Sequence, residues 1–177
     1  MLEDSRLLEL VNNGDKDGLN QIYAKYKNEL LTIARSLLPD IHTAEDCLHN
    51  VIVKFVSSNS SSHIHNLRSY LIKSVVNQAK DQLKKTKKQS DCRVETLDYD
   101  SNSIAPSMRM IEIEESNKVF EALAKLPNEQ REVIVMHIHG EMKFKEIADF
   151  QCVSTNTVQS RYAYGIEKLR TFLGKES

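Results

Sequence analysis

The chain has 177 residues, of which 40% are hydrophobic and 28% are charged, and its formal net charge is -1. These values predict a soluble intracellular protein of one or two compact domains. A near-neutral charge is not that of a uniformly basic nucleic-acid-binding protein, so the distribution of charge is more informative than its sum.

The first twenty residues carry acids where a secretory signal would carry basic residues, and no run is long and apolar enough to span a bilayer. We therefore expect a cytoplasmic protein without membrane insertion. Cys47, Cys92 and Cys152 are odd in number and lack CxxC spacing, which argues against a disulfide framework or a zinc ribbon. Cys47 and Cys152 are interpreted as small core residues, whereas Cys92 lies in a connector.

Residues 17–38 carry a broad apolar stripe at steps of three and four, which predicts one helix or two helices ending at Pro39. Thr43 resembles the N-cap of a further helix. The residues of that helix expected to turn inward are Ala44, Leu48, Val51 and Phe55, and those expected to form an acidic and polar outer face are Glu45, Asp46, His49 and Asn50.

A serine-rich loop from Ser57 to Asn66 precedes the next predicted helix, residues 67–88. Its expected buried residues are Leu67, Leu71, Val75, Ala79 and Leu83. Between Asn66 and Ser90, seven basic residues face one acid, a local charge of +6. This basic end suits the helix dipole and phosphate binding.

The stretch from 91 to 117 reverses the charge to -5, contains Pro106 and sustains no helical period around its centre. It predicts a linker at 89–113 between a domain at 1–88 and a domain at 114–177. Glycine and proline are scarce and strand-like alternation is absent. The predicted fold class is therefore all-α, with two small helical domains joined by a flexible linker.

The C-terminal stretch from Phe144 to Arg170 has the pattern of a helix, a tight turn and a second helix. Ser154 is a suitable N-cap for the second helix. Its expected buried seam is Val158, Tyr162, Ile166, Leu169 and Leu173.

The outer face of this second helix offers small polar side chains instead of the Glu and Lys pairs of an ordinary solvated helix. These are Thr155, Asn156, Gln159 and Ser160, with Ala163 beside them. Such side chains suit the major groove of DNA. The alternative is a helical hairpin whose polar face is merely solvated.

Four motifs in this order resemble the extracytoplasmic-function (ECF) type of bacterial sigma factor over nearly the whole chain. AEDCLHNVI at 44–52 is similar to the family's A-E-D-L-x-Q-E/D-V-F helix. LRSYLIKSVVNQAKDQLKK at 67–85 is similar to its F-R-x-W-L helix, with Tyr70 in place of Trp. LPNEQREV at 126–133 and the E-I-A…T-V-x-S-R…L-R pattern from Glu146 to Arg170 are similar to its second domain.

The resemblance implies a protein that binds core RNA polymerase, recognises two promoter elements and promotes transcription initiation. The residues expected at the minus thirty-five element are Lys143, Lys145, Thr155, Asn156, Gln159, Ser160, Arg161 and Ala163. Those expected at the minus ten element are His63, His65, Asn66, Arg68, Tyr70, Lys73, Asn77, Gln78, Lys80, Lys84 and Lys85. The polymerase-binding face would comprise Glu45, Asp46, His49 and Asn50.

In this family the loop before the minus ten helix captures a flipped base, and here that loop is Ser57–Asn66; a plain surface connection is the alternative. His49 and Asn50 depart from the family's usual Gln and acid, and Lys143 and Cys152 stand where Ser and Gly are common. An anti-sigma factor is a further candidate partner whose identity cannot be read from the sequence.

Two other classes of protein were weighed. A helix-turn-helix regulator that does not recruit core polymerase would leave the basic helix and the A-E-D segment unexplained. An enzyme lacks support, because the sequence has no G-x-S-x-G, H-E-x-x-H or phosphate-cradling glycine loop. We expect no catalytic residues and no cofactor, and His63 with His65 lacks a third ligand for a metal site.

Overall fold

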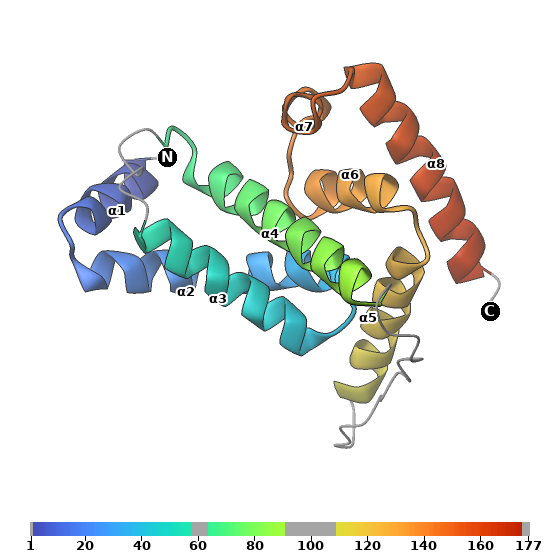
Figure 1. Ribbon diagram of the computed structural model, residues 1–177, viewed down its shortest axis with the longest axis horizontal. Helices are drawn as coiled ribbons and strands as arrows, with labels where there is room; N and C mark the ends of the chain where they lie inside the picture. The colour runs from blue at the N-terminus through green and yellow to red at the C-terminus, as the bar shows by residue number, and fades with distance from the viewer. Residues whose placement is uncertain (1, 58–63, 91–108, 175–177) are drawn as a thin grey trace.

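The computed structural model describes residues 2–57, 64–90 and 109–174, which form eight helices and no strand (Figure 1). The all-α class predicted from the sequence is confirmed for this part of the chain. Helices α1 to α4, here called the N-terminal half, are α1 (Leu2–Asn12), α2 (Lys16–Leu37), α3 (Ile41–Ser57) and α4 (Leu67–Ser90). Helices α5 to α8, the C-terminal half, are α5 (Arg109–Ala124), α6 (Asn128–Ile138), α7 (Phe144–Gln151) and α8 (Thr155–Gly174).

Helix α2 lies at the centre of the N-terminal half and packs against α1, α3 and α4. The apolar stripe predicted for it forms one continuous helix, in which Ile22, Leu30 and Ile33 are fully buried. Tyr23, at the edge of this stripe, is 38% exposed. Gly18 allows α1 to approach closely, because a Cβ atom there would lie 2.6 Å from the Cβ of Leu10.

Helix α3 begins three residues earlier than predicted. Asp40, and not Thr43, caps it: the Asp40 carboxylate accepts hydrogen bonds from the Thr43 backbone N–H at 2.8 Å and from the Thr43 hydroxyl at 2.6 Å. An ionised carboxylate is a stronger acceptor for the first-turn N–H groups than a hydroxyl, so the helix starts at Ile41. The predicted inward face is buried, and so is Cys47, which was predicted to be a core residue.

Helix α4 buries two faces. The predicted face, which includes Leu67, Leu71, Val75 and Ala79, packs toward α2 and α3, whereas Leu83 is only partly buried. Ile72 and Val76 are also fully buried, although the sequence analysis did not assign them to the core. They form a second apolar stripe at i and i+4, which faces the C-terminal half.

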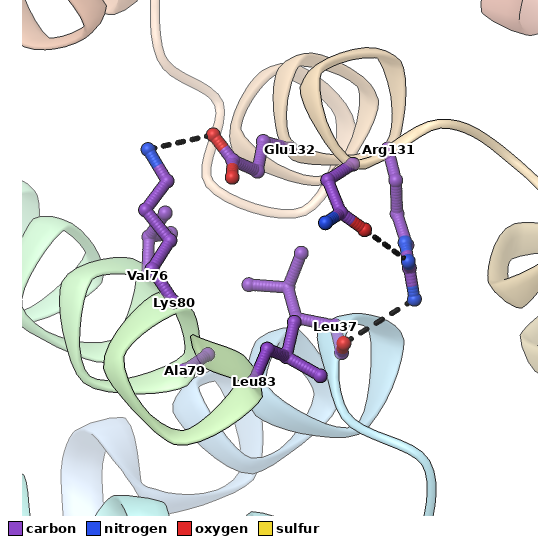
Figure 2. Close-up of a pocket in the computed structure, with 8 residues that line it drawn as sticks. Leu37, Val76, Ala79, Lys80, Leu83, Arg131 and Glu132 are labelled. Carbon is purple, nitrogen blue, oxygen red and sulfur yellow. Dashed lines mark hydrogen bonds and ion pairs between the residues drawn. The ribbon is translucent and has the colours of Figure 1, made fainter. Parts of the chain in front are cut away.

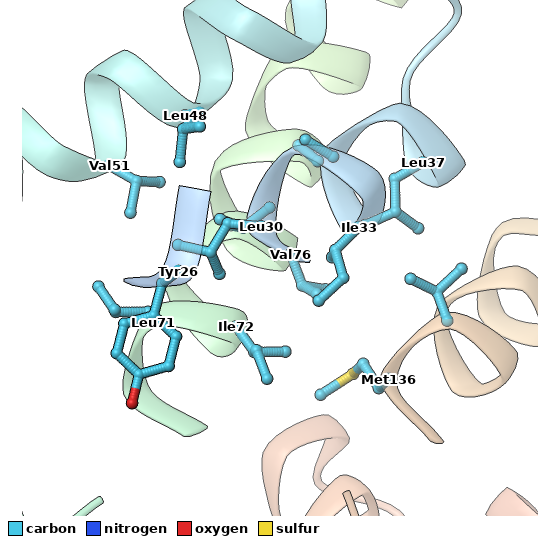
Figure 3. Close-up of a cluster of buried hydrophobic side chains, with 14 of the residues drawn as sticks. Tyr26, Leu30, Ile33, Leu37, Leu48, Val51, Leu71, Ile72, Val76 and Met136 are labelled. Carbon is cyan, nitrogen blue, oxygen red and sulfur yellow. The ribbon is translucent and has the colours of Figure 1, made fainter. Parts of the chain in front are cut away.

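The C-terminal half has a small cluster of its own, built on Leu123, Leu126 and Ile134. Most of the other buried hydrophobic residues of this half belong to the same continuous cluster as the core of the N-terminal half. Figure 3 shows Met136 of α6 directed toward Ile72 and Val76. The two halves therefore share one hydrophobic core in this structure.

The seam predicted for α8 holds from Val158 to Leu169, but Leu173 is 38% exposed and Phe172 packs in its place. A helix turns by 100° per residue, so after Leu169 the position three residues on lies closer to the C-terminal cluster than the position four residues on.

The ends of the predicted linker at 89–113 lie in helices, because α4 continues to Ser90 and α5 begins at Arg109. Good helix formers such as Arg, Met and Glu favour this earlier start of α5. Residues 91–108, with Cys92, lie outside the described part. Among the described helices, none combines the length and the apolar character that a bilayer crossing requires.

Candidate nucleic-acid interface

A three-residue turn separates α7 from α8. The Ser154 hydroxyl accepts a hydrogen bond from the Thr157 backbone N–H at 3.1 Å, as expected for an N-cap. Cys152 ends α7 in the left-handed conformation, with φ 54°, and is exposed. Its predicted core position is therefore wrong, since a left-handed residue at a helix end points away from the helix packing.

Lys143 is the N-cap residue of α7, at a position where the family commonly has Ser, and a hydrogen bond of its backbone partly replaces the missing Ser cap. The Glu146 carboxylate accepts a hydrogen bond from the Lys143 backbone N–H at 2.9 Å, which is half of a capping box. The side chains of Lys143 and Lys145 are exposed.

An aromatic cluster fixes α7 against α6 and α8. The His137 ring stacks on Phe144 with centroids 4.2 Å apart and meets Tyr162 edge-on at 5.0 Å. His137 Nδ1 lies 2.8 Å from the Met142 carbonyl oxygen, so Nδ1 carries the proton and donates. These contacts identify His137 as a structural residue and hold the turn in place.

The outer face of α8 is exposed at Asn156, Gln159, Ser160 and Ala163, whereas Thr155 is partly covered. Tyr164 lies on the same face and is 61% exposed, the largest value among the exposed large apolar side chains of the described residues. The sequence analysis missed it. Its spacing of four from Ser160 was the available signal.

Arg161 does not point freely away from α8. Its guanidinium donates to Gln151 Oε1 at 2.8 Å, and Gln151 in turn donates to Glu132 at 2.9 Å. Glu132 is a charged residue that is only 7% exposed. Arg161, which is predicted at the minus thirty-five element, is thus linked through Gln151 to a buried carboxylate.

Helix α4 begins at a cap provided by Asn66, whose side-chain oxygen accepts from the Ser69 backbone N–H at 2.9 Å. His65 is exposed. His63 and the rest of 58–63 lie outside the described residues, and no group of three potential metal ligands occurs among the residues described.

The basic residues predicted on α4 divide into two sets. Lys84 and Lys85 are exposed and Lys73 is partly covered. Arg68 instead pairs with Glu29, donates to the Gly140 carbonyl oxygen at 3.0 Å and lies 3.2 Å from Glu141. Lys80 is 2.8 Å from Glu132 (Figure 2). Arg68 and Lys80 therefore contact the C-terminal half.

The surroundings of Arg68 keep it charged. Burial alone would lower its pKa, but hydrogen bonds and the charge of Glu29 raise it above its ordinary value. Cys47 behaves in the opposite way, since burial raises the pKa of its thiol to about 12 and leaves it neutral.

A groove of about 190 Å³ lies between α3 and α4. Tyr70, Asn77 and Gln78 line it, and the Tyr70 ring lies 6.0 Å from that of Phe55. Lys54 donates to Gln78 Oε1 at 2.6 Å. The groove thus combines an aromatic face with two amides, which is the chemistry that recognises a nucleobase.

A second groove, of about 530 Å³, lies between α2 and α3. Glu45, Asp46 and His49 form one wall, and Tyr23 and Lys27 lie on the other. Asn50 is exposed nearby. All four residues predicted at the polymerase-binding face are therefore exposed, and three of them line one groove.

The sequence profile described as ECF sigma factor matches residues 1–175. The chain belongs to the ECF sigma factor family. It is therefore a sigma factor, a DNA-binding component of transcription initiation by RNA polymerase, and the family consists of transcription factors and not of enzymes. The resemblance drawn from the four motifs is confirmed.

Two curated relatives come from Bacillus subtilis (strain 168). The ECF RNA polymerase sigma factor SigW is 24% identical over 173 residues, which cover 92% of both chains. The RNA polymerase sigma factor SigV is 26% identical over 152 residues, covering 85% of this chain and 88% of its own.

Two solved structures share the fold. CnrH, determined in complex with the cytosolic domain of CnrY, is 21% identical with a TM-score of 0.71 and covers 99% of each chain. The sigma factor RpoE from Bartonella quintana, determined in complex with the anti-sigma factor NepR, is 20% identical with a TM-score of 0.72. The match covers 88% of this chain and 96% of RpoE.

Proposed function

We propose that this sigma factor docks on core RNA polymerase through the α2–α3 groove and recognises a promoter at two elements, through α8 and α4. The observation that carries the proposal is the exposed polar face of α8, which follows a capped turn and presents Asn156, Gln159 and Ser160 to solvent. Short amide and hydroxyl side chains at the start of a helix suit the base edges of the major groove.

At the minus thirty-five element, Asn156, Gln159 and Ser160 would contact base edges, with Thr155 and Ala163 beside them. Tyr164, one turn beyond Ser160, joins this set because its exposed ring can pack on a thymine methyl group or a sugar. Lys143 and Lys145 would contact phosphates and position the helix.

At the minus ten element, the exposed Lys84 and Lys85 would neutralise phosphates and release counterions. Tyr70, Asn77 and Gln78 make the α3–α4 groove a candidate pocket for one unstacked base. Such a pocket would compensate part of the free energy that strand opening requires without ATP.

The α2–α3 groove would bind a basic surface of core polymerase through Glu45 and Asp46. Interfacial carboxylates steer association with a positively charged partner. A role at RNA polymerase also places the chain in the cytoplasm. Because the relative RpoE was determined with an anti-sigma factor, we include such a protein among the proposed partners.

The experiment is run-off transcription with core polymerase on a random promoter library, together with a comigration assay on core alone. Glu45→Gln with Asp46→Asn should weaken comigration, whereas Asn156→Ala with Gln159→Ala should leave it intact and relax the selected upstream element. Each base-edge contact contributes about 1–3 kcal/mol of discrimination.

Thr171→Ala, an exposed position near the end of α8, is the matched control for the α8 variants. Failure of the wild-type chain to comigrate with core would favour the alternative function, a helix-turn-helix regulator that acts without recruiting polymerase. Equal loss on all DNA sequences after Asn156→Ala with Gln159→Ala would contradict the assignment of these residues to base edges.

A further inference from the structure

Glu132 forms an ion pair with the ammonium group of Lys80 across the seam between the two halves. The Lys80 Nζ atom lies 2.8 Å from Glu132 Oε2, and the same oxygen accepts a hydrogen bond from Gln151 at 2.9 Å. The Lys80 ammonium also lies 5.2 Å from the centroid of the Phe150 ring. Lys80 on α4 therefore contacts a carboxylate and an aromatic ring of the C-terminal half. Figure 2 shows its ion pair with Glu132.

The same carboxylate is linked to a second basic residue. Gln151 accepts a hydrogen bond from Arg161 at 2.8 Å while it donates to Glu132. Lys80 belongs to the residues predicted at the minus ten element, and Arg161 to those predicted at the minus thirty-five element. One carboxylate therefore engages a candidate phosphate contact from each half.

Glu132 has the chemistry to compete with a DNA phosphate for these cations. It is 7% exposed, and a carboxylate removed from water requires charged or hydrogen-bonding partners. A phosphate offers Lys80 the same kind of anionic oxygen. Arg68 also pairs with a carboxylate across the seam, that of Glu141 at 3.2 Å, but the Glu141 side chain is 75% exposed and therefore remains hydrated. The contacts of Arg68 with Gly140 and of Arg131 with Leu37 use backbone carbonyl oxygens.

The seam is tightly packed, with a remaining cavity of only about 10 Å³ lined by Lys80, Arg131 and Glu132. A compact chain of this length has a radius of gyration of about 16 Å. The minus ten and minus thirty-five elements are about 25 base pairs apart, or roughly 85 Å along the duplex. The compact arrangement cannot contact both elements, so the halves must separate before both are bound.

We propose that Glu132 is an intramolecular phosphate mimic, which keeps Lys80 paired and the two halves closed until promoter DNA takes its place. The proposal rests on the proposed DNA contact of Lys80. DNA binding would then also open the chain. A phosphate bound at Lys80 or at Arg161 removes one partner from the contacts that link Lys80, Glu132, Gln151 and Arg161, and so favours the open form.

The experiment measures the distance between the halves by double electron–electron resonance. Spin labels are placed at Val53→Cys on α3 and Thr171→Cys on α8, both exposed, in a full chain whose native cysteines are replaced. Wild-type chain should show a short distance. Glu132→Gln should shift the equilibrium toward long distances by at least about tenfold, because it breaks a pair with one buried partner and one partner, Lys80, whose side chain is 31% exposed.

Glu129→Gln, exposed on the same helix, removes the same charge and should leave the distance unchanged. Addition of a random-sequence 30-base-pair duplex should lengthen the wild-type distance, with less opening as salt rises. Glu132→Gln should also bind that duplex at least about tenfold more tightly than Glu129→Gln, because more of the chain is competent to bind.

Lys80→Gln provides a second variant, since it breaks the same pair from the other half without altering the helices around Gln151. It should open the chain as well, and the double variant should open it no further. The proposal is overturned if Lys80→Gln and Glu132→Gln both remain as closed as Glu129→Gln, or if DNA leaves the wild-type distance unchanged.

These outcomes are separable from the proposed function, because the distance measurement contains no polymerase. A chain that opens on Glu132→Gln and with DNA but never joins core polymerase would refute recruitment and support the role of Glu132 in closing the chain. A chain that recruits polymerase with unchanged distances in every variant would refute that role of Glu132 alone.

Discussion

The two halves of the molecule differ in how they bury apolar surface. The N-terminal half packs three long helices around α2, and fully buried side chains such as Ile22, Leu30 and Ile33 lie among its own elements. The C-terminal half has only Leu123, Leu126 and Ile134 in a cluster of its own. Most of its other buried hydrophobic residues join the core of the N-terminal half.

This difference shows that the C-terminal half depends on its neighbour. Separation of the halves would expose Met136 on one side and Ile72 and Val76 on the other, and each such side chain contributes about 1.5–3 kcal/mol when it is buried. A partner surface or DNA that covers these side chains would offset this cost and favour the open form, in addition to any loss of the Lys80–Glu132 pair. The closed form needs no such partner.

The largest expected effect comes from Met136→Ala, which breaks the shared core. Met136 is fully buried against α4, so its truncation should lower the free energy of unfolding by about 2–5 kcal/mol. Urea denaturation measures the loss. Hydrogen exchange should accelerate in α6 and also in α4 around Ile72.

Leu123→Ala is the matched control, because Leu123 is 2% exposed in the separate cluster of the C-terminal half. It should accelerate exchange in α5 and α8 and spare α4. If Met136→Ala also left α4 unchanged, the two halves would be independent units and the comparison between them would fail.

An effect of intermediate size, and of opposite sign, is expected at Cys152 and should be confined to the C-terminal half. A non-glycine residue in the left-handed region is strained by roughly 1–2 kcal/mol, and Cys152 has φ 54° and ψ 44°. Cys152→Gly should therefore stabilise the α7–α8 pair by about 1 kcal/mol, after allowance for the greater freedom of glycine in the unfolded chain.

Cys152→Ala keeps the strain and removes only the thiol, so its thermal unfolding midpoint should stay close to that of the wild-type chain. A gain of equal size for Ala and Gly would assign the effect to the exposed thiol and not to the backbone. Exchange in α1 to α3 should not respond to either change.

Local sequence patterns predicted the elements well where each position has one dominant neighbour. The steps of four, four and three from Val158 to Leu169 identified the buried side of α8, and Ser154 was recognised as its cap. The cap of α3 was misplaced because Asp40 and Thr43 are both capping residues. Only the hydrogen bonds between them show which one accepts.

Contacts between distant segments could not be read in the same way. Lys80 and Glu132 lie in different halves, and no helical spacing relates them. A signal for the shared core was nevertheless present: Ile72 and Val76 form a second apolar stripe on α4, which a helix with only one partner would not bury. Weighing that stripe would have indicated a second partner for α4.

The smallest expected effect lies in the N-terminal half, where it tests how α1 is held on α2. Asp4 accepts hydrogen bonds from Lys25 at 2.8 Å and from the Tyr26 hydroxyl at 2.9 Å, which ties α1 to α2. Burial alone would raise the pKa of Asp4, but these hydrogen bonds and the charge of Lys25 hold it below its ordinary value of 3.8. A carboxyl group with a lowered pKa stabilises the fold only while it is ionised.

This contribution is therefore present above pH 3.8 and is lost as the pH falls through the lowered pKa of the folded protein. Because the site is partly exposed, the change should be about 1 kcal/mol or less. Hydrogen exchange of α1, corrected for the intrinsic effect of pH, should accelerate in this acidic window.

Asp4→Asn should already be less protected at neutral pH and should lose the pH dependence, whereas Glu3→Gln, with a side chain 74% exposed, should change little. Unchanged protection of α1 in acid for the wild-type chain, and at neutral pH for Asp4→Asn, would instead assign the docking of α1 to its own buried side chains Leu7 and Leu8.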